Sequence, residues 1–329
     1  MADSKLSALT QQSVPALGDF TYVDDITGPT SVKQSWDRAL GLLTLPGQGR
    51  LTTETGVPVS ITDRTAQGTI YYTPYVGKIV TLYDGTRWRV YSTAEISLAL
   101  TATSGKNYDV FLYDNAGTIT MELSAAWTND TTRADALTTQ DGVQVKSGAL
   151  TRRWVGTIRA SGTNVTADSG GTARTSQVGA QRFVWNAYNQ VRRPMSVIDT
   201  TDSWAYTTGT IRQANGATGN KNEWVTGDAA TLVEFQIAGT VYMSTSASGS
   251  LIGIGIDTTT AMSGVIASAF NSSGSMAIDF AMNASYRGVP GLGYHYASWN
   301  EKGATVTCTF TGDNGGDGRQ TGLVGSIFA

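Results

Sequence analysis

The chain has 329 residues, of which 38 are glycine, and only 15% are charged, compared with roughly 25% in an average globular domain. With a formal net charge of −3 it has no basic face to neutralise phosphates, so neither nucleic acid nor an anionic lipid surface is an expected partner. A single cysteine excludes an intramolecular disulfide and cysteine-based zinc sites, and a single histidine removes most imidazole chemistry. Abundant glycine and threonine with only 7 prolines favour an all-β architecture.

The length allows two or three modest domains. No run of 18 apolar residues occurs, and no charged segment followed by an apolar one opens the chain. We therefore expect no membrane insertion and no signal peptide, and we expect the protein to be made in a cytoplasm.

Residues 1–50 predict a leader that contains one short strand and one helix. The strand, Phe20–Val23, lies between breaks at Gly18-Asp19 and Gly28-Pro29. Thr30 or Ser31 caps the predicted helix, whose apolar face consists of Val32, Trp36, Leu40 and Leu43. One strand and one amphipathic helix cannot close a core between them, so we expect both to pack against another surface.

Residues 51–180 predict a module of short strands joined by tight turns. Asp84 and Gly85 separate two alternating segments, which is the strongest short-range signal for a β-hairpin. A turn at 114–117 predicts a second hairpin. The strands expected in this module are 68–73, 78–83, 87–91, 106–113, 118–123, 143–147 and 154–158.

Residues 181–196 predict a linker with a short helix that Pro194 ends, although a strand leading into a loop fits the same residues. Residues 197–329 predict a C-terminal sandwich or jelly roll, because turns punctuate seven candidate strands. The final apolar segment, Gly322–Phe328, is expected to lie in a sheet or against a neighbouring subunit. The seven strands are 211–213, 231–237, 240–244, 251–256, 276–283, 291–298 and 305–310.

The leader resembles the N-terminal segment of tailed-bacteriophage fibre and spike proteins. It opens with the pattern Leu-x-Ala-Leu … Pro-Ala-x-Gly-Asp at 6–19, continues with Tyr-Val-Asp-Asp at 22–25, and then has a Ser/Thr-Lys helix start. Three strings in the middle module, at 63–75, 82–88 and 106–113, are similar to a β-module of virion appendage proteins. The resemblance implies a virion structural protein, a fibre or spike subunit of the tail or head that is made in the bacterial cytoplasm.

Under this resemblance the N-terminus binds other virion proteins and the C-terminal domain faces the host surface. Together with the isolated apolar helix, it also implies a homotrimer around a threefold axis. It supplies no catalytic residue and no cofactor. The residues expected to mediate virion attachment are Phe20, Tyr22, Val23, Trp36 and Leu40.

Aromatic residues beside polar loops predict a glycan platform in the C-terminal domain, for which host surface polysaccharide is the expected partner. An aromatic face stacks on the apolar side of a pyranose, while amides and carboxylates bind its hydroxyls. The alternative is that the tryptophans pack between sheets. The platform residues are Trp204, Tyr206, Trp224 and Trp299.

No nucleotide-binding or serine-hydrolase motif is present, and the carboxylate pairs follow no catalytic pattern, so we expect no enzyme. His295 is expected to be hydrogen-bonded, and Cys308 to be a small buried hydrophobe. We assign no metal site, since the acidic segment 313–317 fails the EF-hand pattern; a looser calcium site there stays open. Two alternatives to an adhesive fibre remain: a decoration or connector protein that binds no receptor, and a polysaccharide-degrading spike.

Overall fold

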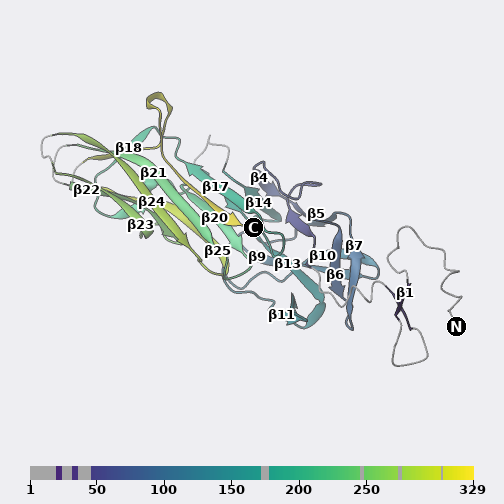
Figure 1. Ribbon diagram of the computed structural model, residues 1–329. Coiled ribbons are helices and arrows are strands. Elements are labelled where there is room, and N and C mark those ends of the chain that lie inside the picture. Colours follow the sequence, from purple (N-terminus) through teal and green to yellow (C-terminus); the bar gives the residue numbers. More distant parts are fainter. Residues whose placement is uncertain are drawn as a thin grey trace.

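The computed structural model describes residues 20–23, 32–35, 46–171, 178–244, 248–272, 276–304 and 307–329. Their regular elements are β-strands, with two short 3-10 turns at Ala214–Gly216 (η2) and Gly315–Asp317 (η3), so the all-β prediction is confirmed. None of the helical turns in these ranges has the length and apolar character needed to cross a membrane. The strands form large curled sheets around two main apolar cores, as in sandwich domains (Figure 1).

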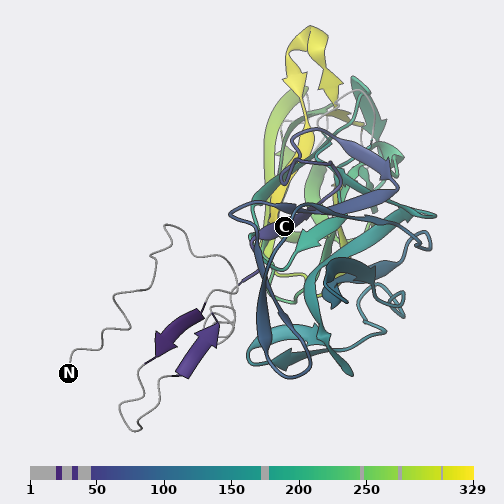
Figure 2. The ribbon, with the colours of Figure 1, turned by 90° about the vertical axis from the view of Figure 1, so that its right-hand side faces the viewer.

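An N-terminal hairpin stands apart from the other strands. Strand β1 (Phe20–Val23) pairs antiparallel with β2 (Val32–Ser35), and in Figures 1 and 2 the pair projects away from the main body. The helix predicted from Thr30 or Ser31 is therefore wrong at its beginning, and residues 36–43 of it lie outside the described ranges. An isolated helix must nucleate without support, whereas β1 offers its partner a ladder of backbone hydrogen bonds.

The middle module is built around one long strand, β13 (Ala149–Gly162), which pairs with four other strands along its length. Both predicted hairpins are confirmed: β6 (Ile79–Tyr83) pairs with β7 (Trp88–Ser92), and β9 (Asn107–Asn115) pairs with β10 (Thr118–Leu123). The module's other strands are β3 (Gly49–Thr52), β4 (Arg64–Gln67), β5 (Thr69–Pro74), β8 (Ile96–Ala99), β11 (Leu137–Gln140), β12 (Val143–Lys146) and β14 (Val165–Ser169).

Two sheets of the C-terminal region face each other across an apolar core. Phe235 packs on Trp224 from the opposite sheet, with ring centroids 5.2 Å apart. The first sheet contains β19 (Ile211–Gln213), β20 (Lys221–Thr226), β22 (Ser248–Ile256), β23 (Ser263–Asn271) and β25 (Gly293–Lys302). The second contains β17 (Arg192–Ile198), β18 (Ser203–Tyr206), β21 (Val233–Met243), β24 (Ile278–Gly288), β26 (Cys308–Thr311) and β29 (Gly322–Phe328).

Strand β29 lies between β17 and β21, which confirms that the final apolar segment is docked in a sheet. The two predicted strands at 231–237 and 240–244 are parts of the single strand β21. A short β-hairpin, β27 (Asp313–Asn314) with β28 (Arg319–Gln320), precedes the final strand.

The short helix predicted within 181–196 is wrong. The segment forms β15 (Gln181–Arg182), β16 (Val184–Asn186) and the beginning of β17, in line with the alternative of a strand leading into a loop. Three consecutive residues, Phe183 to Trp185, are buried, because this segment is covered on both faces. Pro194 is tolerated because β17 lies at the edge of its sheet, where one missing N–H costs little.

Asp109 of β9 is the centre of a buried network that joins the middle module to the C-terminal sandwich. Arg133, one of its partners, also donates through Nη2 to the Gly227 carbonyl at 2.6 Å. Burial raises the pKa of Asp109, although Arg133 and the other donors favour its charged form. The donors to its carboxylate are Arg133 Nε (2.8 Å), Thr157 Oγ1 (2.7 Å), Trp127 Nε1 (3.1 Å) and Trp154 Nε1 (3.0 Å).

Replacing Asp109→Asn removes the charge that Arg133 needs and turns one acceptor into a donor. We expect the free energy of unfolding to fall by about 3–5 kcal/mol, as when one partner of a buried ion pair is lost. Asp114→Asn on the same strand is the control, since Asp114 is exposed and should change stability by about 1 kcal/mol or less. Denaturant unfolding of the two variants measures both values, and equal small losses would contradict the role of the network.

Candidate functional site

The tryptophans of the predicted glycan platform are core residues. Trp204, Trp224 and Trp299 are only 8%, 0% and 1% exposed, so the prediction of a solvent-facing platform is wrong for all three. Trp204 and Trp299 meet edge to face at 5.7 Å, and Trp204 Nε1 donates to Glu301 Oε2 at 2.7 Å. Their positions on β18, β20 and β25 point between the sheets, where large aromatic side chains fill the core.

Tyr206, the fourth platform residue, is half-buried at the end of β18. The Arg212 guanidinium lies over its ring at 3.7 Å, and its hydroxyl donates to the Thr210 carbonyl at 3.0 Å. Arg212 also forms an ion pair with the buried Glu301, at 2.8 Å. Burial raises the pKa of Glu301, and its three donor groups oppose that shift. This arrangement stabilises the sheet edge. Arg212 covers one face of the Tyr206 ring, so that face is not available for stacking on a sugar.

His295 and Cys308 behave as expected. His295 is buried, and its Nδ1 lies 2.8 Å from Asp257 Oδ2, which confirms a hydrogen-bonded histidine. Cys308 is fully buried in the core. Within the described ranges, no group of three or more His, Cys, Asp or Glu side chains is placed to hold a metal ion.

The attachment residues fall in the leader, of which the structure describes residues 20–23, 32–35 and 46–50. Phe20, Tyr22 and Val23 lie on β1, whereas Trp36 and Leu40 lie outside the described residues. Their role in virion attachment stays a prediction.

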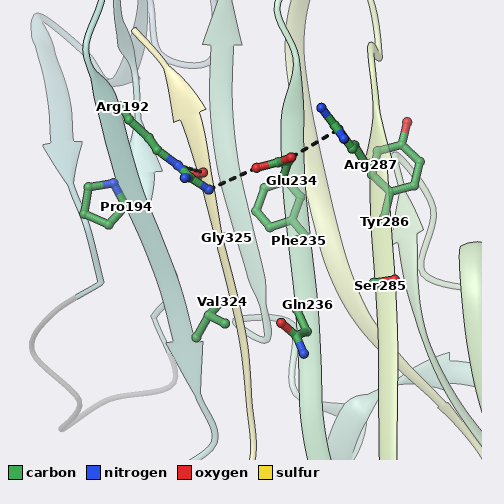
Figure 3. Close-up of a pocket in the computed structure, with 11 residues that line it drawn as sticks. Arg192, Pro194, Glu234, Phe235, Gln236, Ser285, Tyr286, Arg287, Val324 and Gly325 are labelled. Atoms are coloured by element: carbon green, nitrogen blue, oxygen red, sulfur yellow. Dashed lines mark hydrogen bonds and ion pairs between the residues drawn. The ribbon is translucent and has the colours of Figure 1, made fainter.

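A shallow groove of about 650 Å³ opens on the outer face of the second sheet (Figure 3). Residues two apart on a strand point to the same face, so strand register sets its lining. The groove is hollow where the short side chains of Ser285 and Ser326 lie between longer ones. One row across four strands consists of Pro194, Ser326, Glu234 and Arg287, and the next of Val324, Gln236 and Ser285.

Three charged side chains form a ladder over this groove. Glu234 accepts a hydrogen bond from Arg192 Nη2 at 3.0 Å and forms an ion pair with Arg287 Nε at 3.1 Å, from opposite sides (Figure 3). Arg192 Nε also donates to Ser326 Oγ at 2.8 Å. The two arginine side chains are 62% and 72% exposed, so the ladder adds little stability and leaves both guanidinium groups accessible to a ligand.

Tyr286 follows Ser285 on β24 but points to the opposite, inner face, because it pairs with the core residue Phe235 and packs against the core of the sandwich. Burial and the negative charge of Asp257 raise the pKa of Tyr286, so its hydroxyl stays protonated at neutral pH. The side chains on the groove face offer an amide, hydroxyls and charged groups within one surface.

Sequence reasoning missed this groove because its lining comes from four strands that are far apart in the chain. The one available signal was the alternation of 231–237, which predicts a buried and a wet face. That signal places Glu234 and Gln236 on the solvent side, and it says nothing about which strands lie beside them.

Comparisons with known proteins do not assign a family. No protein-family model matches the chain, and no curated protein matches it. One matching solved structure is the insecticidal delta-endotoxin Cry8Ea1 from Bacillus thuringiensis, at 9% identity and a TM-score of 0.22. The match covers 95% of this chain and 60% of the toxin chain, and at that TM-score it carries no argument about fold or function.

Trp224→Ala and Trp299→Ala test the reassignment of the platform to the core. We expect each to lower the free energy of unfolding by about 3–5 kcal/mol, because each leaves a cavity in a packed core. Tyr242→Ala, which removes a partly exposed aromatic from β21, should cost about 1 kcal/mol or less. Denaturant unfolding measures the free energy of unfolding of all three variants. If the tryptophan variants were as stable as the wild type, the core assignment would be wrong.

Proposed function

We propose that the chain is a structural subunit of a bacteriophage fibre or spike, attached to the particle by its N-terminus and presenting its C-terminal sandwich to the host. The observation that carries the proposal is the separation of the two ends. In Figure 1 the β1–β2 hairpin lies at one end of the molecule, and strands β18, β22 and β23 lie at the other. Such an arrangement suits a protein that binds a particle at one end and a cell at the other.

The groove on the sandwich is the surface through which we propose contact with host glycans. This groove replaces the buried tryptophans as the proposed glycan-binding surface. Gln236 supplies an amide, Ser285 a hydroxyl and Val324 an apolar contact, which are side-chain types that bind sugar hydroxyls and the apolar parts of a sugar.

A polysaccharide-degrading enzyme has less support than an adhesin. Three buried carboxylates, Asp109, Asp168 and Glu301, are each engaged by arginine donors, and two of them also by tryptophan. Carboxylates held in this way serve the fold, because their lone pairs are already occupied. A decoration or connector protein differs from an adhesin in one measurable property, the absence of cell binding.

Removing residues 1–45 tests the proposed attachment function of the N-terminus separately from the proposed cell binding of the C-terminal sandwich. The truncated chain keeps all described strands from β3 onward, so we expect it to fold, to stain host bacteria saturably and to be absent from virions. Fluorescently labelled protein measures staining, and purified particles measure incorporation. Normal incorporation of the truncated chain would contradict the attachment role. No staining by the folded full-length chain would favour a decoration or connector role.

We also propose that copies of the chain assemble as a homotrimer, and β23 offers a contact surface. Phe270 is 62% exposed, and Val265, Ile266 and Met276, on or close to the same strand, are also exposed. Residues 263–278 contain no charged side chain, so this exposed apolar surface carries no charge that would oppose association between copies. Burial of these side chains between copies would remove them from water.

Phe270→Asp tests this contact, because a carboxylate cannot be buried there without a partner. By mass photometry we expect the wild-type chain at three times its 34.7 kDa and the variant shifted to a smaller species. Ile61→Asp, at an exposed apolar residue of the middle module, is the control that should leave the mass unchanged. A monomeric or dimeric wild-type chain would show the homotrimer to be wrong.

A further inference from the structure

We infer that the groove binds a carboxylate-bearing sugar chain, with Arg192 and Arg287 holding its acid groups. The inference rests on the proposed function, since it names the class of glycan that the groove selects. Its basis is the juxtaposition of two exposed guanidinium groups with one carboxylate, that of Glu234, fixed between them (Figure 3).

Both arginines keep unused donors. A guanidinium carries five N–H groups. Arg192 uses Nε toward Ser326 and Nη2 toward Glu234, and Arg287 uses Nε toward Glu234. In the part of the chain that the structure describes, the remaining N–H groups of both side chains are therefore left for a ligand. Glu234 orients both arginines in advance, which reduces the ordering cost of binding.

The charge of the groove is opposite to that of the chain. Two arginines and one glutamate give the lining a net charge of +1, within a chain of net charge −3. A planar guanidinium pairs with a carboxylate through two parallel hydrogen bonds. Glu234 repels any further carboxylate from the space between the arginines. The ligand's acid groups are therefore expected at the outer edges of the ladder, spaced along a chain.

The neutral parts of the same ligand meet the second row of the groove. Gln236 donates from Nε2 to Asn283 Oδ1 at 2.9 Å, which orients the amide and leaves its oxygen as an acceptor for a sugar hydroxyl. Val324, exposed beside Gln236, supplies an apolar contact. The volume of about 650 Å³ lies within the roughly 300–1,000 Å³ of ligand sites. Because the groove is shallow and open, a polymer can lie across it.

Calorimetric titration of the full-length chain tests the ligand class with three polymers: polygalacturonate, neutral dextran and dextran sulfate. We expect saturable binding of polygalacturonate and much weaker binding of the other two. Arg192→Gln and Arg287→Gln should each weaken polygalacturonate binding about tenfold, the effect of losing a charge-assisted hydrogen bond. Arg287→Lys should weaken it as well, because it keeps the charge and loses the planar fork.

Arg319→Gln is the matched control, because Arg319 pairs with Asp279 at the surface outside the groove lining and its loss should change nothing. Denaturant unfolding checks that each variant is folded. Equal binding of dextran sulfate, unaffected by Arg287→Lys, would overturn the inference in favour of general charge attraction.

Staining of host bacteria separates this inference from the proposed function. Staining that depends on Arg192 and Arg287, without polygalacturonate binding, would overturn the ligand class and leave the adhesin standing. Staining that the double arginine variant leaves unchanged would remove the groove from host contact and overturn the inference. Loss of both staining and polygalacturonate binding in the double variant is the result expected here.

Discussion

The carboxylate of Asp109 holds the two β-rich parts of this chain together. It lies on β9 in the middle module, and its partner Arg133 reaches the Gly227 carbonyl of the C-terminal region. A Cβ at Gly227 would lie 2.5 Å from the Trp185 ring, so this close approach needs glycine. Loss of the charge would leave Arg133 largely buried without its anion, which costs more than the pair itself contributes. The placement of the sandwich, and of the groove it carries, depends on this junction together with strand β15, which pairs with β14 of the middle module and with β20 of the sandwich.

The tryptophans that the sequence predicts to bind glycans are buried in the interior of the sandwich. Trp224 and Trp299 lie beside polar loops in the sequence, yet both face inward and fill the space between sheets. Glu301 is buried with them and bound by Trp204 and Arg212. The surface left for a ligand is therefore the outer face of the second sheet, whose polar side chains alternate with the core residues of the same strands.

Local signals predicted local structure well. The hairpin around Asp84 and Gly85 formed as expected, because its turn chemistry and its pairing lie within fifteen residues of each other. The helix predicted within 181–196 failed because burial on both faces produces a run of apolar residues that does not define a period. Strand β23, rich in glycine, serine and alanine, was missed, since its pairing with β22 depends on the neighbouring strand more than on its own β-propensity.

The sequence by itself determined the all-β class, the hairpins, the low charge and the docking of the final apolar strand, since each follows from composition or from neighbouring residues. The tertiary structure alone decided that the tryptophans are core and that Arg192, Glu234 and Arg287 form one ladder. These three residues meet through the register of strands that lie far apart in the chain. Register is set by how whole sheets bury their inner faces, and no short segment of sequence carries that information.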